Sequence, residues 1–241
     1  MPAVFVHGVP DTQLVWQPLL TNLKRKDVIC LSLPGFGNKR PSGFSPDKDS
    51  YVSWLISELK KIPGPIDLIG HDWGSLLVTR AVSVEPSLVR SWCGGGAPLD
   101  PDYVWHDTAK IWQTPGQGEE LMKIFGGKGL AQGLAAQGIP LAQAREAAAS
   151  IDDEMKTCIL TLYRSAIHTA DEWFQNLSRV RAPSLILWGD RDPYSPPSFG
   201  ERLAANVKGK YLAVKDAGHW YQVEKPTFVA EQLEAFWRSV G

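Results

Sequence analysis

Short apolar runs alternate with helical segments along most of the 241-residue chain. The runs "AVFVH" (3–7), "DVICLSL" (27–33) and "IDLIG" (66–70) are typical of buried strands, because they are short, apolar and rich in branched residues. Further strands are expected over 89–95, 184–190 and 210–214. Apolar strands separated by helices form parallel sheets that are covered on both faces. The chain is therefore predicted to fold as an α/β domain.

One region interrupts this alternation. Between Pro98 and Arg181 there is no strand pattern, and helical patterns follow one another over 107–113, 119–125, 141–151 and 155–174. The segment 129–149 is rich in Ala, Gly and Gln and is expected to be a cap helix of small residues. An all-helical insertion between two strands predicts a cap over the carboxyl ends of the sheet, where open α/β sheets bind ligands. The predicted division is a core of 1–97 and 182–241 with a cap of 98–181.

Charge and cysteine content narrow the class of partner and compartment. The 25 basic and 26 acidic residues nearly cancel, which gives no reason to expect a nucleic acid or an anionic membrane as partner. No apolar stretch approaches the ~20 residues of a membrane-spanning helix. Three scattered cysteines (Cys30, Cys93 and Cys158) lack metal-ligand spacing and are expected to be free thiols. We expect a cytoplasmic protein without a metal or cofactor. Whether it forms a homodimer is left open.

A candidate nucleophile lies after the third predicted strand, in the sequence "GHDWG" (70–74). Gly-x-Asp-x-Gly between a strand and a helix has the pattern of a nucleophile elbow, a sharp turn that exposes one side chain. The glycines are required because the turn is strained and its surroundings are crowded. The helix is expected to begin at Ser75. The alternative is a simple turn in which Asp72 caps that helix.

A candidate base and acid follow in the order that hydrolases with such an elbow use: nucleophile, acid, histidine. His219 lies between the last predicted strand and the last helix, at the sheet edge that carries the elbow. Asp190 and Asp192 both follow the strand 184–190, and Asp192 is preferred because its loop can turn back toward His219. The alternative is that both are ordinary turn residues. The other histidines precede glycine turns (His7, His71) or lie in the expected cap (His106, His168).

An aspartate nucleophile selects a particular chemistry. A carboxylate can displace a group at a saturated carbon, and the product is an ester of the enzyme itself. Water activated by His219 can then attack the ester carbonyl, while Asp192 orients the imidazole. The oxyanion hole is assigned to the backbone N–H groups of Val9 and Trp73. Asp72 thus indicates small hydrophobic organic substrates such as epoxides and organic halides.

Four motifs together resemble the aspartate-nucleophile branch of the α/β-hydrolase superfamily, which includes epoxide hydrolases and haloalkane or haloacetate dehalogenases. They are "HGVPD" (7–11), "GHDWG" (70–74), "WGDRDP" (188–193) and "GHWYQVEKP" (218–226). The resemblance implies an α/β-hydrolase fold with a mostly parallel sheet and an inserted helical cap. Family members often carry two strands before the first motif, so a sheet of about six strands is expected here.

The resemblance also implies that the cap holds the leaving group. Epoxide hydrolases use cap tyrosines as donors to the epoxide oxygen. The segment "TLYRSA" (161–166) resembles one that carries such a tyrosine, which nominates Tyr163, with Tyr103 as its candidate partner. The alternative for Tyr163 is a core aromatic residue on a cap helix.

Dehalogenases instead need donors to a halide. Trp73 suits that role because an indole N–H can only donate. The second donor would come from Trp105, His106 or Trp112 in the cap. Many haloalkane dehalogenases carry a polar residue at the position of Val9, and haloacetate dehalogenases tend to carry Arg at that of Trp73.

Three hypotheses follow from these patterns. Epoxide hydrolysis is first, because the "HG-x-P" and "GHW…EKP" motifs favour it, and haloalkane dehalogenation is second. The third is a ligand-binding homologue without catalysis. An intact set of Asp72, Asp192 and His219 argues against that third hypothesis, because a receptor does not need all three.

Overall fold

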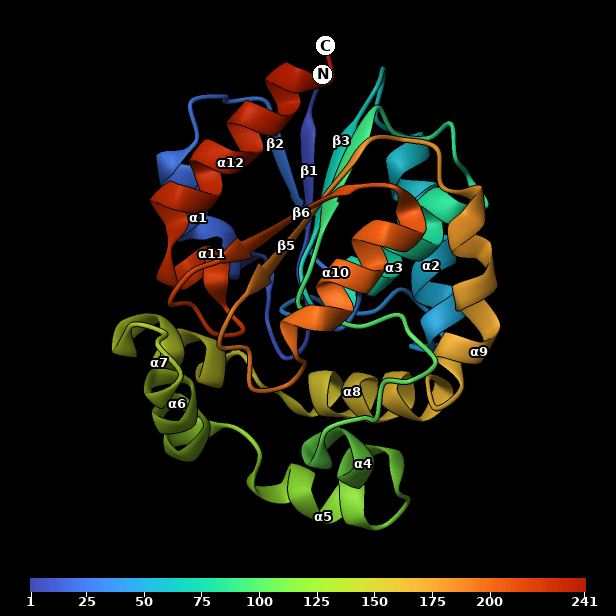
Figure 1. Ribbon diagram of the computed structural model, residues 1–241. Coiled ribbons are helices and arrows are strands. Elements are labelled where there is room, and N and C mark those ends of the chain that lie inside the picture. Colours follow the sequence, from blue (N-terminus) through green and yellow to red (C-terminus); the bar gives the residue numbers. More distant parts are fainter.

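The computed structural model describes residues 1–241 and contains one six-stranded sheet whose strands are all parallel (Figure 1). The strand order is β2-β1-β3-β4-β5-β6. The strands are β1 (Ala3–Val6), β2 (Val28–Leu31), β3 (Asp67–Gly70), β4 (Ser91–Gly94), β5 (Ser184–Gly189) and β6 (Lys210–Val214). The predicted α/β-hydrolase fold with about six parallel strands is thereby confirmed.

The centre of the sheet sets the position of the site. Strand β1 pairs with β2 on one side and with β3 on the other, so the chain order reverses at β1. Val6, the last residue of β1, is in register with Gly70, the last residue of β3. In open α/β sheets a crevice forms outside the carboxyl ends of the strands at such a reversal. The sequence "GHDWG" begins there.

Helices cover both faces of the sheet, each over its own apolar cluster. One face carries the 3₁₀ helix η1 (Gln13–Trp16), α1 (Gln17–Asn22), α11 (Tyr221–Glu224) and α12 (Pro226–Ser239). The other carries α2 (Lys48–Lys60), α3 (Trp73–Val84) and α10 (Pro197–Val207). Burial on both faces explains why the strands are apolar throughout rather than alternating.

The chain between β4 and β5 is helical throughout. Its elements are α4 (Asp107–Gln113), α5 (Gln117–Ile124), α6 (Gly127–Ala136), α7 (Leu141–Ala149), α8 (Asp153–Ser165), α9 (Thr169–Trp173) and η2 (Phe174–Arg179). Helices α4 to α8 lie across the end of the sheet opposite the two chain termini (Figure 1). In contrast, η2 packs against α3 beside the sheet, so the structural cap ends before residue 181.

The expected single helix over 155–174 is wrong, because α8 ends at Ser165. The Ser165 hydroxyl donates to the Leu162 carbonyl, a local bond that competes with continuation of the helix. The same oxygen accepts a hydrogen bond from the Lys48 N–H at 3.0 Å, which joins the end of α8 to the start of α2. This contact fixes where the cap meets the core.

Other boundaries also differ from expectation. The helix after the elbow begins at Trp73 rather than Ser75, and the segment 129–149 forms parts of two helices, α6 and α7. Gly138 and Pro140 separate those two helices, because Gly138 has a φ of +95° and proline cannot continue a helix. Helix α10 is not anticipated by any pattern. No helix has both the length and the apolar content that crossing a bilayer requires.

Candidate active site

The elbow is a strained turn that leaves no spare room. Asp72 adopts φ +53° and ψ −126°, a conformation that side chains other than glycine rarely take. A Cβ atom on Gly74 would stand 2.1 Å from the Val6 carbonyl oxygen, and one on Gly70 would stand 2.4 Å from the Gly74 carbonyl oxygen. Glycine is therefore required at both positions, as the sequence pattern predicts.

The two oxygens of the Asp72 carboxylate have different surroundings. Oδ1 accepts a hydrogen bond from the Val9 backbone N–H at 2.7 Å, and the Trp73 backbone N–H lies near this carboxylate. Oδ2 lies 3.7 Å from Nε2 of His219. A Cβ on Gly8 would come within 2.3 Å of Oδ1, so only glycine lets the β1 loop approach this closely. The structure thus places the Val9 N–H on one oxygen and leaves the other toward the histidine.

His219 is held between two carboxylates. Its Nδ1 lies 2.9 Å from Oδ2 of Asp192, and its Nε2 faces Asp72. Oδ1 of Asp192 accepts from the backbone N–H groups of Tyr194 at 2.8 Å and Ser195 at 3.2 Å. Asp190 instead pairs with Lys215 at 3.6 Å. Between the two aspartates considered, the geometry therefore places Asp192 against the imidazole.

Burial and charge act in opposite directions on the protonation of these groups. Burial alone would lower the pKa of His219, but Asp192, Asp72 and Asp11 outweigh it and raise the pKa to about 9. Burial raises the pKa of Asp72, and the His219 charge with the N–H groups of Val9 and Trp73 partly offsets that increase. With a pKa of about 9, His219 is an imidazolium at neutral pH and faces the Asp72 carboxyl group.

Two further buried side chains support His219. Nε2 of His71 lies 2.8 Å from the His219 carbonyl oxygen and ties the base loop to the elbow. Asp11 is buried, and Trp220 Nε1 donates to it at 3.0 Å. Burial raises the pKa of Asp11 to about 7, although the Trp220 hydrogen bond opposes this shift. The motif "HGVPD" contains Asp11, but no sequence pattern indicates that Asp11 lies near His219.

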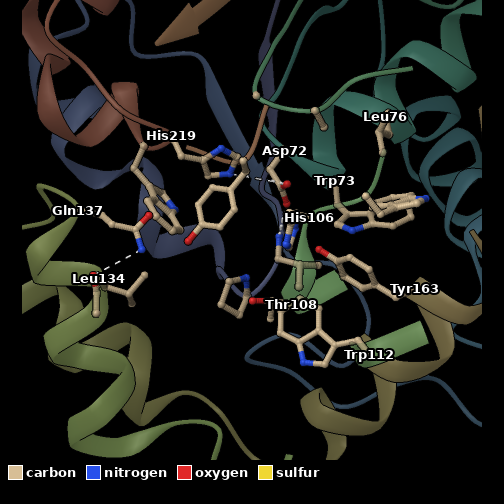
Figure 2. Close-up of a pocket in the computed structure, with 18 of the residues that line it drawn as sticks. Asp72, Trp73, Leu76, His106, Thr108, Trp112, Leu134, Gln137, Tyr163 and His219 are labelled. Carbon is tan, nitrogen blue, oxygen red and sulfur yellow. Dashed lines mark hydrogen bonds and ion pairs between the residues drawn. The ribbon is translucent and has the colours of Figure 1, made fainter. Parts of the chain in front are cut away.

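A cavity of about 200 Å³ opens between the elbow and the cap (Figure 2). Its wall is largely aromatic and aliphatic, and Asp72 is the only acidic side chain on it. No lysine or arginine lines it. Small-molecule sites are typically apolar with a few placed polar groups. The lining favours a neutral, mostly apolar ligand.

Tyr163 comes from α8 and is buried in this cavity wall. Figure 2 shows its hydroxyl directed into the cavity, toward the side that Trp73 and Asp72 occupy. The Tyr163 ring packs edge-on against the Trp73 indole, with ring centroids 5.4 Å apart. Burial raises the pKa of Tyr163 well above its ordinary value, so the phenol keeps its proton.

The other cap candidates separate into two groups. Trp105, His106 and Trp112 line the cavity, and Trp105 stacks on Trp73 with ring centroids 6.2 Å apart. Tyr103 does not line it, because its hydroxyl donates to the Tyr194 carbonyl at 3.2 Å. Tyr103 therefore contacts the loop of Tyr194 and does not provide a second hydrogen-bond donor beside Tyr163.

Nδ1 of His106 accepts the Ala109 N–H at the start of α4 at 3.2 Å. Burial lowers the pKa of His106 to about 4, so the ring is neutral at neutral pH. A neutral ring whose Nδ1 accepts carries its proton on Nε2. His106 is thus a neutral N–H donor in the cavity wall.

With this geometry in place, comparison with known proteins is informative. A model of the alpha/beta hydrolase family matches residues 3–232. The chain belongs to the alpha/beta hydrolase family. It is 23% identical over 247 residues to (E)-2-((N-methylformamido)methylene)succinate hydrolase of Acinetobacter baylyi, covering 98% of this chain and 89% of that protein. It is 22% identical over 261 residues to Epoxide hydrolase 4 of Mus musculus, covering 97% of this chain and 72% of that protein.

Solved structures agree on the fold. A haloalkane dehalogenase DbeA-M1 loop variant from Bradyrhizobium elkanii superimposes with a TM-score of 0.77 at 18% identity, covering 98% of this chain and 90% of that one. These relatives are hydrolases with differently named substrates, and the coarse conclusion that this chain is a hydrolase follows from them. Fold alone does not select the substrate, which depends on the site.

No sequence pattern indicated that two further residues of this hydrolase line the cavity. Tyr194 follows Asp192 on the acid loop, and its ring lies 5.0 Å from that of His219. Gln137 follows α6 and lies at the other side of the cavity from Tyr163 (Figure 2). Both belong to segments read as a turn or as a small-residue helix. Only the three-dimensional arrangement of acid loop and cap shows that they face a ligand.

Proposed function

We propose that this protein is an epoxide hydrolase that works through a covalent ester on Asp72. The proposal rests on the different surroundings of the two carboxylate oxygens of Asp72. Oδ1 is held by the Val9 N–H, while Oδ2 is left toward His219 and the cavity. A free carboxylate oxygen beside an apolar cavity is suited to attack a saturated carbon.

In the first half-reaction, Oδ2 of Asp72 attacks one epoxide carbon and the bond from that carbon to the epoxide oxygen breaks. The epoxide oxygen takes a proton from the Tyr163 hydroxyl, and the product is an alkyl ester of Asp72. A neutral phenol directed into the cavity supports this role. General-acid assistance of this kind contributes typically 10²–10⁴-fold in rate.

In the second half-reaction, His219 removes one proton from a water that attacks the ester carbonyl. The resulting negative charge forms on Oδ1, which the Val9 N–H already contacts. Collapse expels the diol oxygen, which takes the proton from His219. The second water proton passes from the Asp72 carboxyl back to His219, which restores the resting imidazolium, so epoxide plus water gives diol and the enzyme is restored.

Electrostatics favour this order of events. The charge of Asp72 helps to hold the pKa of His219 at about 9 in the resting site. Ester formation removes that charge, so the pKa of His219 must fall once Asp72 is alkylated. The Tyr163 phenolate left by the first half-reaction takes the proton that His219 gives up, so the imidazole becomes a competent base only after that step.

The decisive experiment is His219→Gln incubated with a panel of epoxides, followed by intact-mass analysis. The first half-reaction does not use His219, so we expect an adduct of the epoxide's full mass, mapped to the peptide that carries Asp72. A suitable control is His168→Gln, because the His168 side chain is 74% exposed and outside the cavity. That variant should turn over epoxides without accumulating an adduct.

If no epoxide gives an adduct in His219→Gln, or if the adduct maps to another residue, the proposal is wrong. The same experiment tests a non-catalytic receptor, which would bind these compounds without any mass change. Diol formation by the wild-type protein completes the comparison.

Haloalkane hydrolysis is the second candidate, and one observation favours it. Nε1 of Trp112 is buried in the cavity wall and has no hydrogen-bond partner, so it could donate to a halide. The other expected halide donor, Trp73, also lines the cavity and packs edge-on against Tyr163. Chloride release from haloalkanes, measured beside diol formation from epoxides of matched size, distinguishes the two.

A further inference from the structure

One polar group in the cavity has no part in the chemistry proposed above. Gln137 is the residue that ends α6, and its side chain reaches the cavity on the side away from Trp73 and Tyr163 (Figure 2). Its Nε2 makes a long hydrogen bond of 3.5 Å to the Gly133 carbonyl within its own helix. Its Oε1 is buried and accepts no hydrogen bond.

A buried acceptor without a partner is costly, because it loses its hydrogen bonds to water and gains none in return. The residues nearest along the chain that line the cavity are Leu130, Gly133 and Leu134, which offer no side-chain donor. The Tyr194 hydroxyl lies beside the Gln137 amide but makes no hydrogen bond to Oε1. This end of the cavity therefore presents an unused acceptor next to a phenol that can donate.

One acceptor beside one donor is complementary to a hydroxyl group, which can donate and accept at once. A charged group would fit poorly, because no lysine, arginine or glutamate lines the cavity and its walls are apolar. The cavity volume of about 200 Å³ modestly exceeds the ~150 Å³ of an apolar cavity that holds benzene. The ligand is therefore a short chain or a single small ring.

We propose that Gln137 and Tyr194 form a subsite for a neutral hydroxyl group on the substrate, remote from the carbon that Asp72 attacks. The inference rests on the proposed epoxide hydrolysis and specifies its substrate class: small epoxides that carry a hydroxyl group at the far end. Their products are triols. The subsite fixes which way round the substrate lies in a cavity whose other walls are apolar.

The test uses ω-hydroxy-1,2-epoxyalkanes of increasing chain length, from the epoxypentanol to the epoxyoctanol. Each is paired with the epoxyalkane in which a methyl group replaces the hydroxyl, so each pair differs only in the remote group. At the chain length that spans the cavity, we expect kcat/KM of the wild-type protein to favour the hydroxyl compound by about tenfold, the effect of one net hydrogen bond.

Gln137→Leu should abolish that preference, so that the ratio of the two kcat/KM values falls to about one, while Tyr194→Phe should reduce the preference. The matched control is Gln143→Leu, because Oε1 of Gln143 is also buried without a partner but faces a separate pocket beneath α7. That variant should keep the wild-type preference. The inference is overturned if the wild-type protein shows no preference at any length, or if Gln137→Leu changes both members of each pair equally.

A binding measurement separates this inference from the proposed function. Asp72→Asn cannot form the ester, so titration calorimetry with the same pairs reports the subsite alone. Loss of the hydroxyl preference on adding Gln137→Leu to Asp72→Asn supports the subsite even if no epoxide is turned over. Turnover of epoxides without any hydroxyl preference supports the proposed function and overturns the subsite.

Discussion

The elbow and the cap are built by opposite means. At the elbow, backbone atoms approach so closely that a Cβ on Gly70 or Gly74 would overlap a neighbouring carbonyl. In the cap, Gly129 and Gly133 on α6 have open space where a Cβ would stand. The attacking group is thus fixed by a crowded turn, whereas α6 beside the cavity leaves room at Gly129 and Gly133 for larger side chains. Reaction type and substrate choice reside in different parts of the fold.

The largest effect should come from the elbow. Asp72→Asn replaces the proposed nucleophile with a neutral carboxamide, and we expect epoxide turnover to fall by at least ~10³-fold. The matched control is Asp190→Asn on the acid loop, which removes only the pair with Lys215. Diol formation measures both. A comparable loss of turnover in the two variants would contradict a distinct catalytic role for Asp72.

The packing contrast itself can be tested by adding one methyl group to each region. Gly74→Ala forces its Cβ against the Val6 carbonyl at 2.1 Å, so we expect a loss of several kcal/mol in the free energy of unfolding. Gly129→Ala lies in an open stretch of α6, where alanine is favoured over glycine by up to ~1 kcal/mol in a helix. Chemical denaturation of both variants measures the change in the free energy of unfolding and its sign. Equal losses of stability would refute the contrast between the elbow and the cap.

The cap should determine the leaving group. Tyr163→Phe removes the hydroxyl that is directed into the cavity, and we expect kcat/KM for epoxides to fall by about 10²-fold. Any haloalkane turnover should change far less, because a halide leaves without a proton. Parallel diol and chloride assays provide the measurement. An equal fall on both substrate classes would show that Tyr163 acts through packing against Trp73 and Trp112.

This contrast also explains what the sequence could and could not predict. The elbow obeys local rules: glycine at crowded positions and a strand followed by a helix, so Asp72 was recognisable. The order of nucleophile, acid and histidine then indicated His219 and an acid after the strand 184–190. Asp192 was preferred to Asp190 because its loop can turn back, and the structure places Asp192 2.9 Å from His219. The sheet was predictable for the same reason, because buried parallel strands leave a continuous apolar pattern.

The cap obeys no comparable rule. Its helices are amphipathic, but a helical period does not show which residues of a given turn will face the cavity. Tyr163 and Tyr103 were both nominated, yet only Tyr163 reaches the cavity, because Tyr103 is tied to the Tyr194 carbonyl. Gln137 lies at a helix end that the sequence did not reveal. Asp11 lies close to His219 only through long-range packing, with Trp220 between the two loops.

Asp11 gives the smallest and most specific test. Because the pKa of Asp11 is about 7, its charge increases from pH 6 to pH 8 and then helps to raise the pKa of His219. Asp11→Asn keeps an oxygen that can accept from Trp220 but removes the charge. We expect the pKa of His219 in the ester to fall, so ester hydrolysis should reach its maximal rate at a lower pH than in the wild-type protein.

The measurement is the decay of the Asp72 adduct by rapid quench and intact-mass analysis across this pH range, with Asp190→Asn as the matched variant. Since neutral Asp11 and asparagine are electrostatically alike, the wild-type protein and Asp11→Asn should agree near pH 6 and diverge only above pH 7. A uniform rate change at every pH would instead mean that Asp11 acts through the position of Trp220, and the core would then tune the base by packing rather than by charge.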